Sequence, residues 1–155
     1  METTTTDAIR KDMVIHAPRE RVWQAISDPA EFGAWFHVDM TGVTFVPGQP
    51  VRAKMTEPGY EGHPFEIVVD RIEAPRLFSF RWHPYGIDPD YDYSSEPMTR
   101  IVFELEEVAG GTRLTVTESG FDAIPLSRRA EAFRMNSEGW AIQLRNVEAY
   151  VGDQA

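Results

Sequence analysis

The feature that most restricts the fold is a change in hydrophobic period near residue 127. From residue 38 to residue 120 the chain consists of short segments in which apolar and polar residues alternate, the period of a half-buried strand. Over residues 127–151 the apolar positions recur at steps of three, four and seven, which predicts one amphipathic helix of about 25 residues. Its apolar stripe contains Phe133, Trp140, Leu144, Val147 and Val151. A sheet face that must be buried is thus followed by one helix able to cover it.

Seven strands and two short helices are predicted before that long helix. The strands are expected at residues 9–17, 38–45, 50–57, 64–74, 76–85, 98–108 and 112–120. After the first strand, Pro18 suits the first turn of one helix, and Asp28 followed by Pro29 suits the start of another. The expected fold is α+β, with a curved antiparallel seven-stranded sheet wrapped around the long C-terminal helix. Because one helix cannot fill a strongly curved sheet, a pocket is expected between them.

Composition describes one domain and excludes several kinds of partner. Residues 1–8 are expected to be a flexible N-terminus and residues 9–152 a single domain. A net charge of −10 disfavours binding to nucleic acid or to an anionic membrane surface. The chain has no cysteine, so disulfides, thiolate zinc sites and a cysteine nucleophile are excluded. No signal peptide and no apolar run long enough for membrane insertion is recognisable, which favours a cytoplasmic location.

Four stretches resemble a known family. They are "IHAPRERVWQAISDPAEFGAWF", "EAPRLFSFRW", "GGTRLTVTESGF" and "NSEGWAIQLRNVEAYV". Together they resemble the START-like, helix-grip superfamily (SRPBCC), and within it the branch named for the activator of Hsp90 ATPase. The resemblance extends from about residue 9 to residue 151 and implies a hydrophobic cavity between the last helix and the sheet. Members bind small apolar or aromatic ligands, catalyse reactions on them or act as partners of other proteins, so function has to be argued from the site.

The acidic loop "WHPYGIDPDYDYSSEP" at residues 82–97 is the most unusual local feature. Asp88, Asp90 and Asp92 have the spacing that opens a calcium-binding loop, but the glycine and the final glutamate of such a loop are missing. We therefore expect no metal there. The loop is longer than a tight hairpin and carries amphipathic aromatic residues, which favours a lid over a pocket mouth. A solvated acidic loop and a homodimer contact are the alternatives. Its tyrosines are Tyr85, Tyr91 and Tyr93.

Glu118 is the residue with the clearest chemical potential. It continues the strand face of Leu114 and Val116, which should point inward. A carboxylate in that position could anchor a ligand hydroxyl or act as a general acid or base. The alternative is that the strand ends or twists near Glu118, so that its side chain reaches solvent or pairs with an arginine.

Residues that could line the predicted pocket come mainly from the aromatic set. Gly139 is included because a glycine within a helix costs about 1 kcal/mol relative to alanine, which close approach of the sheet or a ligand, or a mild kink, would explain. The four histidines lack the spacing of a metal site, and no cofactor is expected. The candidate ligand-binding residues are Trp35, Phe36, Phe80, Trp82, Tyr85, Glu118, Phe121, Met135, Gly139 and Trp140.

These patterns favour a module that binds a small apolar or aromatic molecule in an internal cavity. An enzyme of the lyase, cyclase or hydrolase type, with Glu118 as general acid–base, is the first alternative. A protein-interaction module of the Hsp90 co-chaperone type is the second, and Hsp90 is then the expected partner. The sequence does not distinguish these by itself, because the family is defined by core and turn residues.

Overall fold

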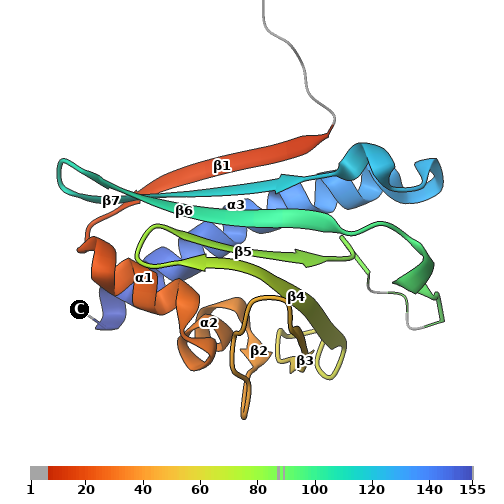
Figure 1. The fold of residues 1–155 in the computed structure, drawn as a ribbon, viewed down its shortest axis with the longest axis horizontal. Helices are drawn as coiled ribbons and strands as arrows, with labels where there is room; N and C mark the ends of the chain where they lie inside the picture. The colour runs from red at the N-terminus through yellow and green to blue at the C-terminus, as the bar shows by residue number, and fades with distance from the viewer. Residues whose placement is uncertain (1–6, 87, 89, 155) are drawn as a thin grey trace, which may run out of the picture.

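The protein is described by a computed structural model covering residues 7–86, 88 and 90–154 (Figure 1). One antiparallel sheet contains all seven strands in the order β1-β7-β6-β5-β4-β3-β2. The strands are β1 (Ala8–Ile15), β2 (Val38–Asp39), β3 (Pro50–Met55), β4 (Pro64–Glu73), β5 (Leu77–Trp82), β6 (Thr99–Val108) and β7 (Gly111–Ser119). The helices are α1 (Arg19–Ser27), α2 (Pro29–Phe36) and α3 (Leu126–Gln154), and short 3-10 turns occupy Tyr93–Ser95 and Phe121–Ala123. The predicted α+β helix-grip fold is confirmed.

The long helix α3 runs along one face of the sheet, and α1 and α2 lie beside its C-terminal half (Figure 1). Its predicted stripe faces the sheet, because Trp140, Leu144, Val147 and Val151 are all buried. Phe133, at the N-terminal end of the stripe, is only partly buried and packs on Phe121. Within the described residues, no helix is both long enough and apolar enough to cross a membrane.

The short helices begin and end where local chemistry predicts. The Asp28 side chain accepts a hydrogen bond of 3.0 Å from the Glu31 backbone N–H, and Pro29 occupies the first turn of α2. This is a standard N-terminal cap, in which a carboxylate satisfies an otherwise unpaired backbone donor. Gly33 allows α2 to approach the chain that follows it, since a Cβ there would lie 2.4 Å from the Val38 carbonyl oxygen. The cap therefore fixes where Phe32 and Phe36 enter the core.

The prediction of a strand over residues 38–45 is wrong beyond its first two residues. Only Val38 and Asp39 pair with β3. The Asp39 side chain accepts hydrogen bonds from both the backbone N–H and the hydroxyl of Thr41, an arrangement that favours a turn over a strand. The apolar Phe45 is nevertheless buried, because the loop folds back against Phe78 with ring centroids 5.2 Å apart. Alternation in this segment reflects packing, not strand pairing.

The residues at the chain ends bear on the domain prediction. Residues 1–6 of the predicted flexible N-terminus lie outside the described part of the chain, and Ala8 already belongs to β1. Pairing of Ala8 with Ser119 brings the start of the chain beside the end of β7. The first and last strands of the sequence are thus neighbours, and β1 and β2 form the two edges of the sheet.

Gly139 is not explained by close approach of α3 to the sheet. A Cβ at this position would meet no atom within 4 Å outside its own helix, so this part of the sequence-based interpretation is wrong. We expect Gly139→Ala to raise the free energy of unfolding by about 1 kcal/mol, because alanine restricts the unfolded chain and favours helix. Urea-induced unfolding followed by circular dichroism measures this, with the exposed Ala149→Gly as the reverse change in the same helix. A less stable Gly139→Ala protein would contradict it.

Candidate functional site

A cleft of about 450 Å³ opens where the end of β5 meets the middle of α3. Its walls come from the end of α2, the end of β3, the start of β4, the end of β5, the loop that follows β5, and α3. Aromatic side chains form much of the lining, which gives a ligand broad apolar faces to contact. They are Phe36, Phe65, Trp82, Tyr85, Tyr91 and Tyr93.

Trp82 connects the cleft to the aromatic core. Its ring stacks on Trp140 with centroids 5.6 Å apart and an interplanar angle of 24°. Phe36 and Phe65 meet Trp82 edge-on at 6.1 and 6.2 Å. Trp140 itself is 2% exposed and does not line the cleft. One face of the Trp82 indole is therefore supported by the core while the residue as a whole remains partly accessible.

Polar groups of the cleft are acidic or neutral. Among the described lining residues there is no lysine and no arginine. Asn136 comes from α3, while the other polar residues come from the start of β4 and from the loop after β5. The polar lining residues are His63, Glu66, His83, Asp88, Asp92, Ser94 and Asn136.

Glu118 is fully buried beneath this cleft and points inward. It lies in β7 opposite Ile9 on one side and Ile101 on the other, and its exposed fraction is 0%. The indole N–H groups of Trp82 and Trp140 donate to it at 2.8 and 2.7 Å, and the Thr99 hydroxyl donates at 2.6 Å. Asn136 Nδ2 lies 3.0 and 3.1 Å from the two carboxylate oxygens. Of the two placements that the sequence left open, the structure has the inward one, with no arginine partner.

The donors around Glu118 match an ionised carboxylate. An indole N–H can only donate, and both oxygens of Glu118 already accept. A protonated carboxyl would have to donate from one oxygen, and of the four partners only the Thr99 hydroxyl has a lone pair that can accept. The carboxylate therefore joins β5, β6, β7 and α3 through four charge-assisted hydrogen bonds, which are stronger than neutral ones. We call Trp82, Thr99, Asn136 and Trp140, together with Glu118, the carboxylate cage.

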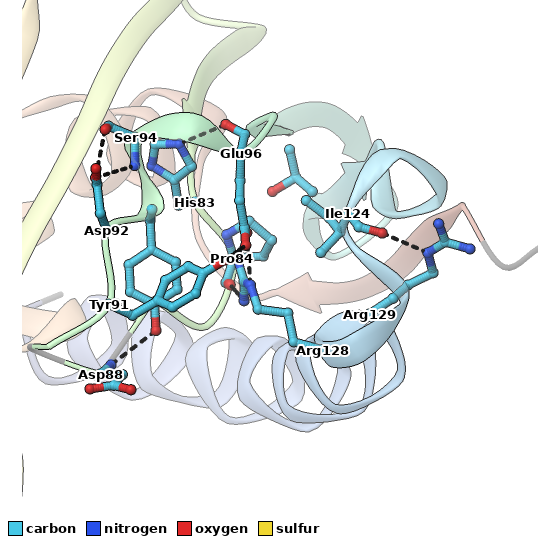
Figure 2. A network of polar contacts seen from close by, with 12 residues as sticks. His83, Pro84, Asp88, Tyr91, Asp92, Ser94, Glu96, Ile124, Arg128 and Arg129 are labelled. Carbon is cyan, nitrogen blue, oxygen red and sulfur yellow. Dashed lines mark hydrogen bonds and ion pairs between the residues drawn. The ribbon is translucent and has the colours of Figure 1, made fainter.

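The loop after β5 is fastened to the first turn of α3 (Figure 2). Arg128 donates to Glu96 Oε1 at 2.7 Å and to the Pro84 carbonyl at 2.6 Å. The Tyr91 hydroxyl donates to the other Glu96 oxygen at 2.5 Å, and the Arg128 guanidinium lies 4.8 Å from the centre of the Tyr93 ring. The Glu96 side chain is only 3% exposed. The tyrosines predicted to form a lid are thus held in place by one buried ion pair.

These contacts shift the pKa values of Glu96 and of Tyr91, whose hydroxyl donates to Glu96. Burial opposes ionisation of Glu96, but hydrogen bonds from Arg128 and Tyr91 outweigh burial and hold the pKa of that carboxyl below its ordinary value. The hydrogen bond to Glu96 in turn raises the pKa of the Tyr91 phenol. Glu96 is therefore the charged acceptor and Tyr91 the neutral donor at neutral pH.

Tyr85 is held in an uncommon backbone conformation at the cleft. Its φ of 50° lies in the left-handed region, which a bulky residue rarely occupies. Burial raises the pKa of its phenol, and the nearby Glu131 adds to that effect. A residue in this conformation costs on the order of 1 kcal/mol or more, and such strain concentrates at functional sites.

The aspartates of the loop are engaged locally. The Asp88 carboxylate accepts from the Asp90 backbone N–H. The Asp92 carboxylate accepts from the backbone N–H and the hydroxyl of Ser94 (Figure 2). Across residues 7–86, 88 and 90–154, no group of three or more acidic or histidine side chains is arranged to hold a metal ion. Residues 87 and 89 of this loop lie outside the described residues.

The structure divides the ten predicted ligand-binding residues into three groups. Phe36, Trp82 and Tyr85 line the cleft. Phe80, Glu118 and Trp140 lie beneath it and contact Trp82. The other four do not line it: Trp35 is buried and donates to the Ala25 carbonyl, Phe121 packs on Phe133, and Met135 and Gly139 are partly buried on α3.

Two lining residues that sequence reasoning missed are Phe65 and Asn136. Asn136 precedes Trp140 by four residues, so both project from the same face of α3. A polar residue one helical turn from a buried tryptophan was the available signal. Phe65 carried no comparable signal, because its place beside Trp82 depends on the pairing of β4 with β5.

The fold recurs in solved structures. MLL2253 from Mesorhizobium loti matches with 20% identity and a TM-score of 0.72, covering 96% of this chain and 98% of that one. NE0264 from Nitrosomonas europaea matches with 17% identity and a TM-score of 0.74, covering 100% of both chains. DynU16, a protein of the dynemicin biosynthetic locus, is 26% identical over 94% of this chain, with a TM-score of 0.70. This chain spans about half, 47%, of the DynU16 chain.

Sequence comparison agrees with the fold. No curated protein matches the chain significantly. The family model for the activator of Hsp90 ATPase homolog 1-like protein matches residues 16–152. This fold is compatible with ligand binding in a cavity. The match covers most of the chain and includes β2 to β7, nearly all of α3 and the carboxylate cage, so the chain belongs to the activator of Hsp90 ATPase homolog 1-like family, within the SRPBCC fold.

Proposed function

We propose that this protein binds a small aromatic or apolar molecule in the cleft beside Trp82. The observation that supports this most is a cleft of about 450 Å³ with a largely aromatic lining and, on α3, a polar side chain, Asn136, that Glu118 holds in place. Ligand sites typically have volumes of roughly 300–1,000 Å³, mostly apolar walls and a few positioned polar groups. A location between the sheet and α3 is also where the family resemblance implies a cavity.

Each part of the site has a role in this proposal. The indole of Trp82, supported by Trp140, provides a rigid face on which a planar ligand can stack. Asn136 provides hydrogen bonding, with its orientation fixed by Glu118. Tyr91 and Tyr93 cover the opening from the loop, and Tyr91 is 46% exposed, so it has apolar surface to lose on binding. DynU16, which comes from a biosynthetic locus, adds support for a role with a small molecule.

The geometry favours binding over catalysis by Glu118. A general acid or base needs a site within hydrogen-bond reach of the reacting proton. Glu118 does not line the cleft, and both of its oxygens already accept hydrogen bonds from the cage. We therefore assign Glu118 a positioning role, through Trp82 and Asn136, in place of the direct ligand contact that the sequence led us to expect.

Binding of the uncharged dye Nile red, whose fluorescence rises in apolar surroundings, tests the proposal. We expect saturable binding to the folded protein, weakened about tenfold by Trp82→Leu, because removing the stacking face loses about 1.4 kcal/mol of aromatic contact. The matched control is Trp23→Leu, since Trp23 is also a partly buried tryptophan but lies on α1 away from the cleft. Fluorescence titration measures both affinities.

Tyr91 gives a second variant, because it is exposed and lies outside the hydrophobic core, although its hydroxyl donates to Glu96. Tyr91→Ala should also weaken binding of the dye, by a smaller factor than Trp82→Leu. Saturable binding that is unchanged in both cleft variants, or an absence of binding to the folded parent protein, would show that the cleft is not the ligand site.

A further inference from the structure

The carboxylate cage determines which end of Asn136 faces the cleft. Glu118 is an acceptor on both oxygens, so the Asn136 amide nitrogen must be the atom that lies 3.0 and 3.1 Å from them. The Asn136 carbonyl oxygen is then the end available to a ligand, and it receives no hydrogen bond from any residue in the described part of the chain. The Trp82 N–H is likewise committed to Glu118. The cage thus removes donors from this end of the cleft and leaves an acceptor.

The rest of the lining has the same character. Glu66 at the start of β4 and Asp88 and Asp92 in the loop contribute carboxylates, which accept hydrogen bonds and carry negative charge. The hydroxyls of Tyr91 and Ser94 already donate, to Glu96 and Asp92 respectively (Figure 2). His83 Nε2 is also engaged, since it lies 3.1 Å from the Glu96 carbonyl oxygen. The side-chain donors that remain among the described lining residues are the phenols of Tyr85 and Tyr93 and the imidazole of His63.

Charges just outside the lining leave the cleft negative. Arg128, which lies over the Tyr93 ring, is neutralised by its contact with Glu96. Near Tyr85, the positive charge of Arg134 and the negative charge of Glu131 shift the pKa of the phenol in opposite directions. The whole chain carries a net charge of −10, which adds a background field of the same sign. Arg52 lies opposite Glu66 on the neighbouring strand β3 and offsets its charge, so Asp88 and Asp92 contribute most of the negative charge at the cleft.

Aromatic rings beside carboxylates are a favourable environment for an organic cation. The negative face of an aromatic ring attracts a cation within about 6 Å of its centre. Within this loop the Tyr93 ring already holds one, since the Arg128 guanidinium lies 4.8 Å from its centre. A ligand with a flat aromatic body and a protonated amine would satisfy the walls, the unpaired Asn136 oxygen and the carboxylates together.

We propose that the cleft prefers aromatic ligands whose side chain ends in a protonated aliphatic amine over the corresponding ligands whose side chain ends in a carboxylate. This inference rests on the proposed binding function and adds the chemical class of the ligand. The amine would donate hydrogen bonds to Asn136 Oδ1 or to a carboxylate of the opening, while its ring stacks on Trp82. An anionic ligand would meet only neutral donors and would be repelled by the carboxylates.

Three indoles that differ only at the end of the side chain test this: tryptamine, tryptophol and indolepropionate. By isothermal titration calorimetry at neutral pH and low salt, we expect tryptamine to bind most tightly and indolepropionate most weakly. Surface charge interactions of about 1 kcal/mol or less each predict a ratio of about tenfold between them. The ratio should shrink at 0.5 M salt, where the screening length falls to about 4 Å.

A matched pair of charge-reversal variants separates the effect of a charge at the cleft from the effect of the net charge of the protein. Glu66→Lys should lower the affinity for tryptamine about fivefold and raise the affinity for indolepropionate, because it reverses a charge at the cleft. Glu104→Lys changes the net charge equally at an exposed position of β6 away from the cleft and should leave both affinities nearly unchanged. Both positions are exposed on strands, so neither variant should prevent folding.

The possible results distinguish this inference from the proposed function. Equal affinities for the three indoles, or tightest binding of indolepropionate, would overturn the amine preference while leaving the binding function in place. If Glu66→Lys and Glu104→Lys change the affinities equally, the preference for the amine comes from the net charge of the protein and not from the cleft, and the inference is overturned. If none of the indoles binds and Nile red does not bind either, the proposed function fails and the inference fails with it.

Discussion

Replacing Glu118 with glutamine should lower the free energy of unfolding by about 3 kcal/mol, although the two side chains have the same shape. Glutamine places an NH₂ group where one carboxylate oxygen accepts hydrogen bonds from tryptophan or threonine. A donor then faces a donor in a site that is 0% exposed, and neither can reach water. Urea-induced unfolding at neutral pH measures the loss.

The same variant tests the ionised state of Glu118, because glutamine imitates a protonated carboxyl group. The control is Glu104→Gln, which makes the same chemical change at an exposed position of β6 and should change the free energy of unfolding little. A Glu118→Gln protein as stable as the parent would mean that the carboxyl group is protonated and donates within the core. In that case the argument for the orientation of Asn136 would also fail.

Arg128→Leu should be the second most damaging change, lowering the free energy of unfolding by about 2 kcal/mol. It leaves the Glu96 carboxylate, 3% exposed, with the Tyr91 hydroxyl as its hydrogen-bond donor but without its cation. Breaking a fully buried ion pair costs about 3–5 kcal/mol, and partial exposure of Arg128 reduces that figure. Hydrogen exchange should also become faster at the loop after β5, which loses its attachment to α3.

Arg145→Leu is the matched control, because Arg145 is an exposed arginine on the same helix. Acid provides an independent measurement. The pKa of Glu96 is lowered in the folded protein, so the contribution of the pair is fully present above the ordinary glutamate pKa of 4.5 and is lost as the pH falls through the lower folded-state value. Glu96→Gln should therefore flatten the loss of stability below about pH 4.5. An unchanged acid dependence would contradict the assigned role of the pair.

Sequence patterns predicted most of the architecture because its elements follow local rules. Alternation across residues 98–120 predicts the inward face of β6 and β7, and steps of three, four and seven predict the buried stripe of α3. Asp28 and Pro29 predict the start of α2 for an equally local reason. The error at residues 40–45 has the opposite origin, since a single side chain, Asp39, formed a turn that competes with strand pairing.

The candidate site was predicted less completely, because its residues meet only through tertiary contacts. Alternation could place Glu118 on the inward face of its strand but could not show which donors would meet it there. Its partners lie on β5, β6 and α3, between 18 and 36 residues away in the chain. The long loop predicted a lid, and its anchor, Arg128, follows Glu96 by 32 residues.

By itself, the sequence determined the order of the helices and of most strands along the chain, and the face that each of them buries. The tertiary structure alone decided that the Glu118 carboxylate points inward beneath an aromatic cleft. It also decided that Trp82, Thr99, Asn136 and Trp140 donate to this carboxylate, which fixes the orientation of the Asn136 amide. The physical reason is that hydrophobic period and capping act over a few neighbouring residues, whereas a buried charge is stable only where the complete fold brings its hydrogen-bond partners together.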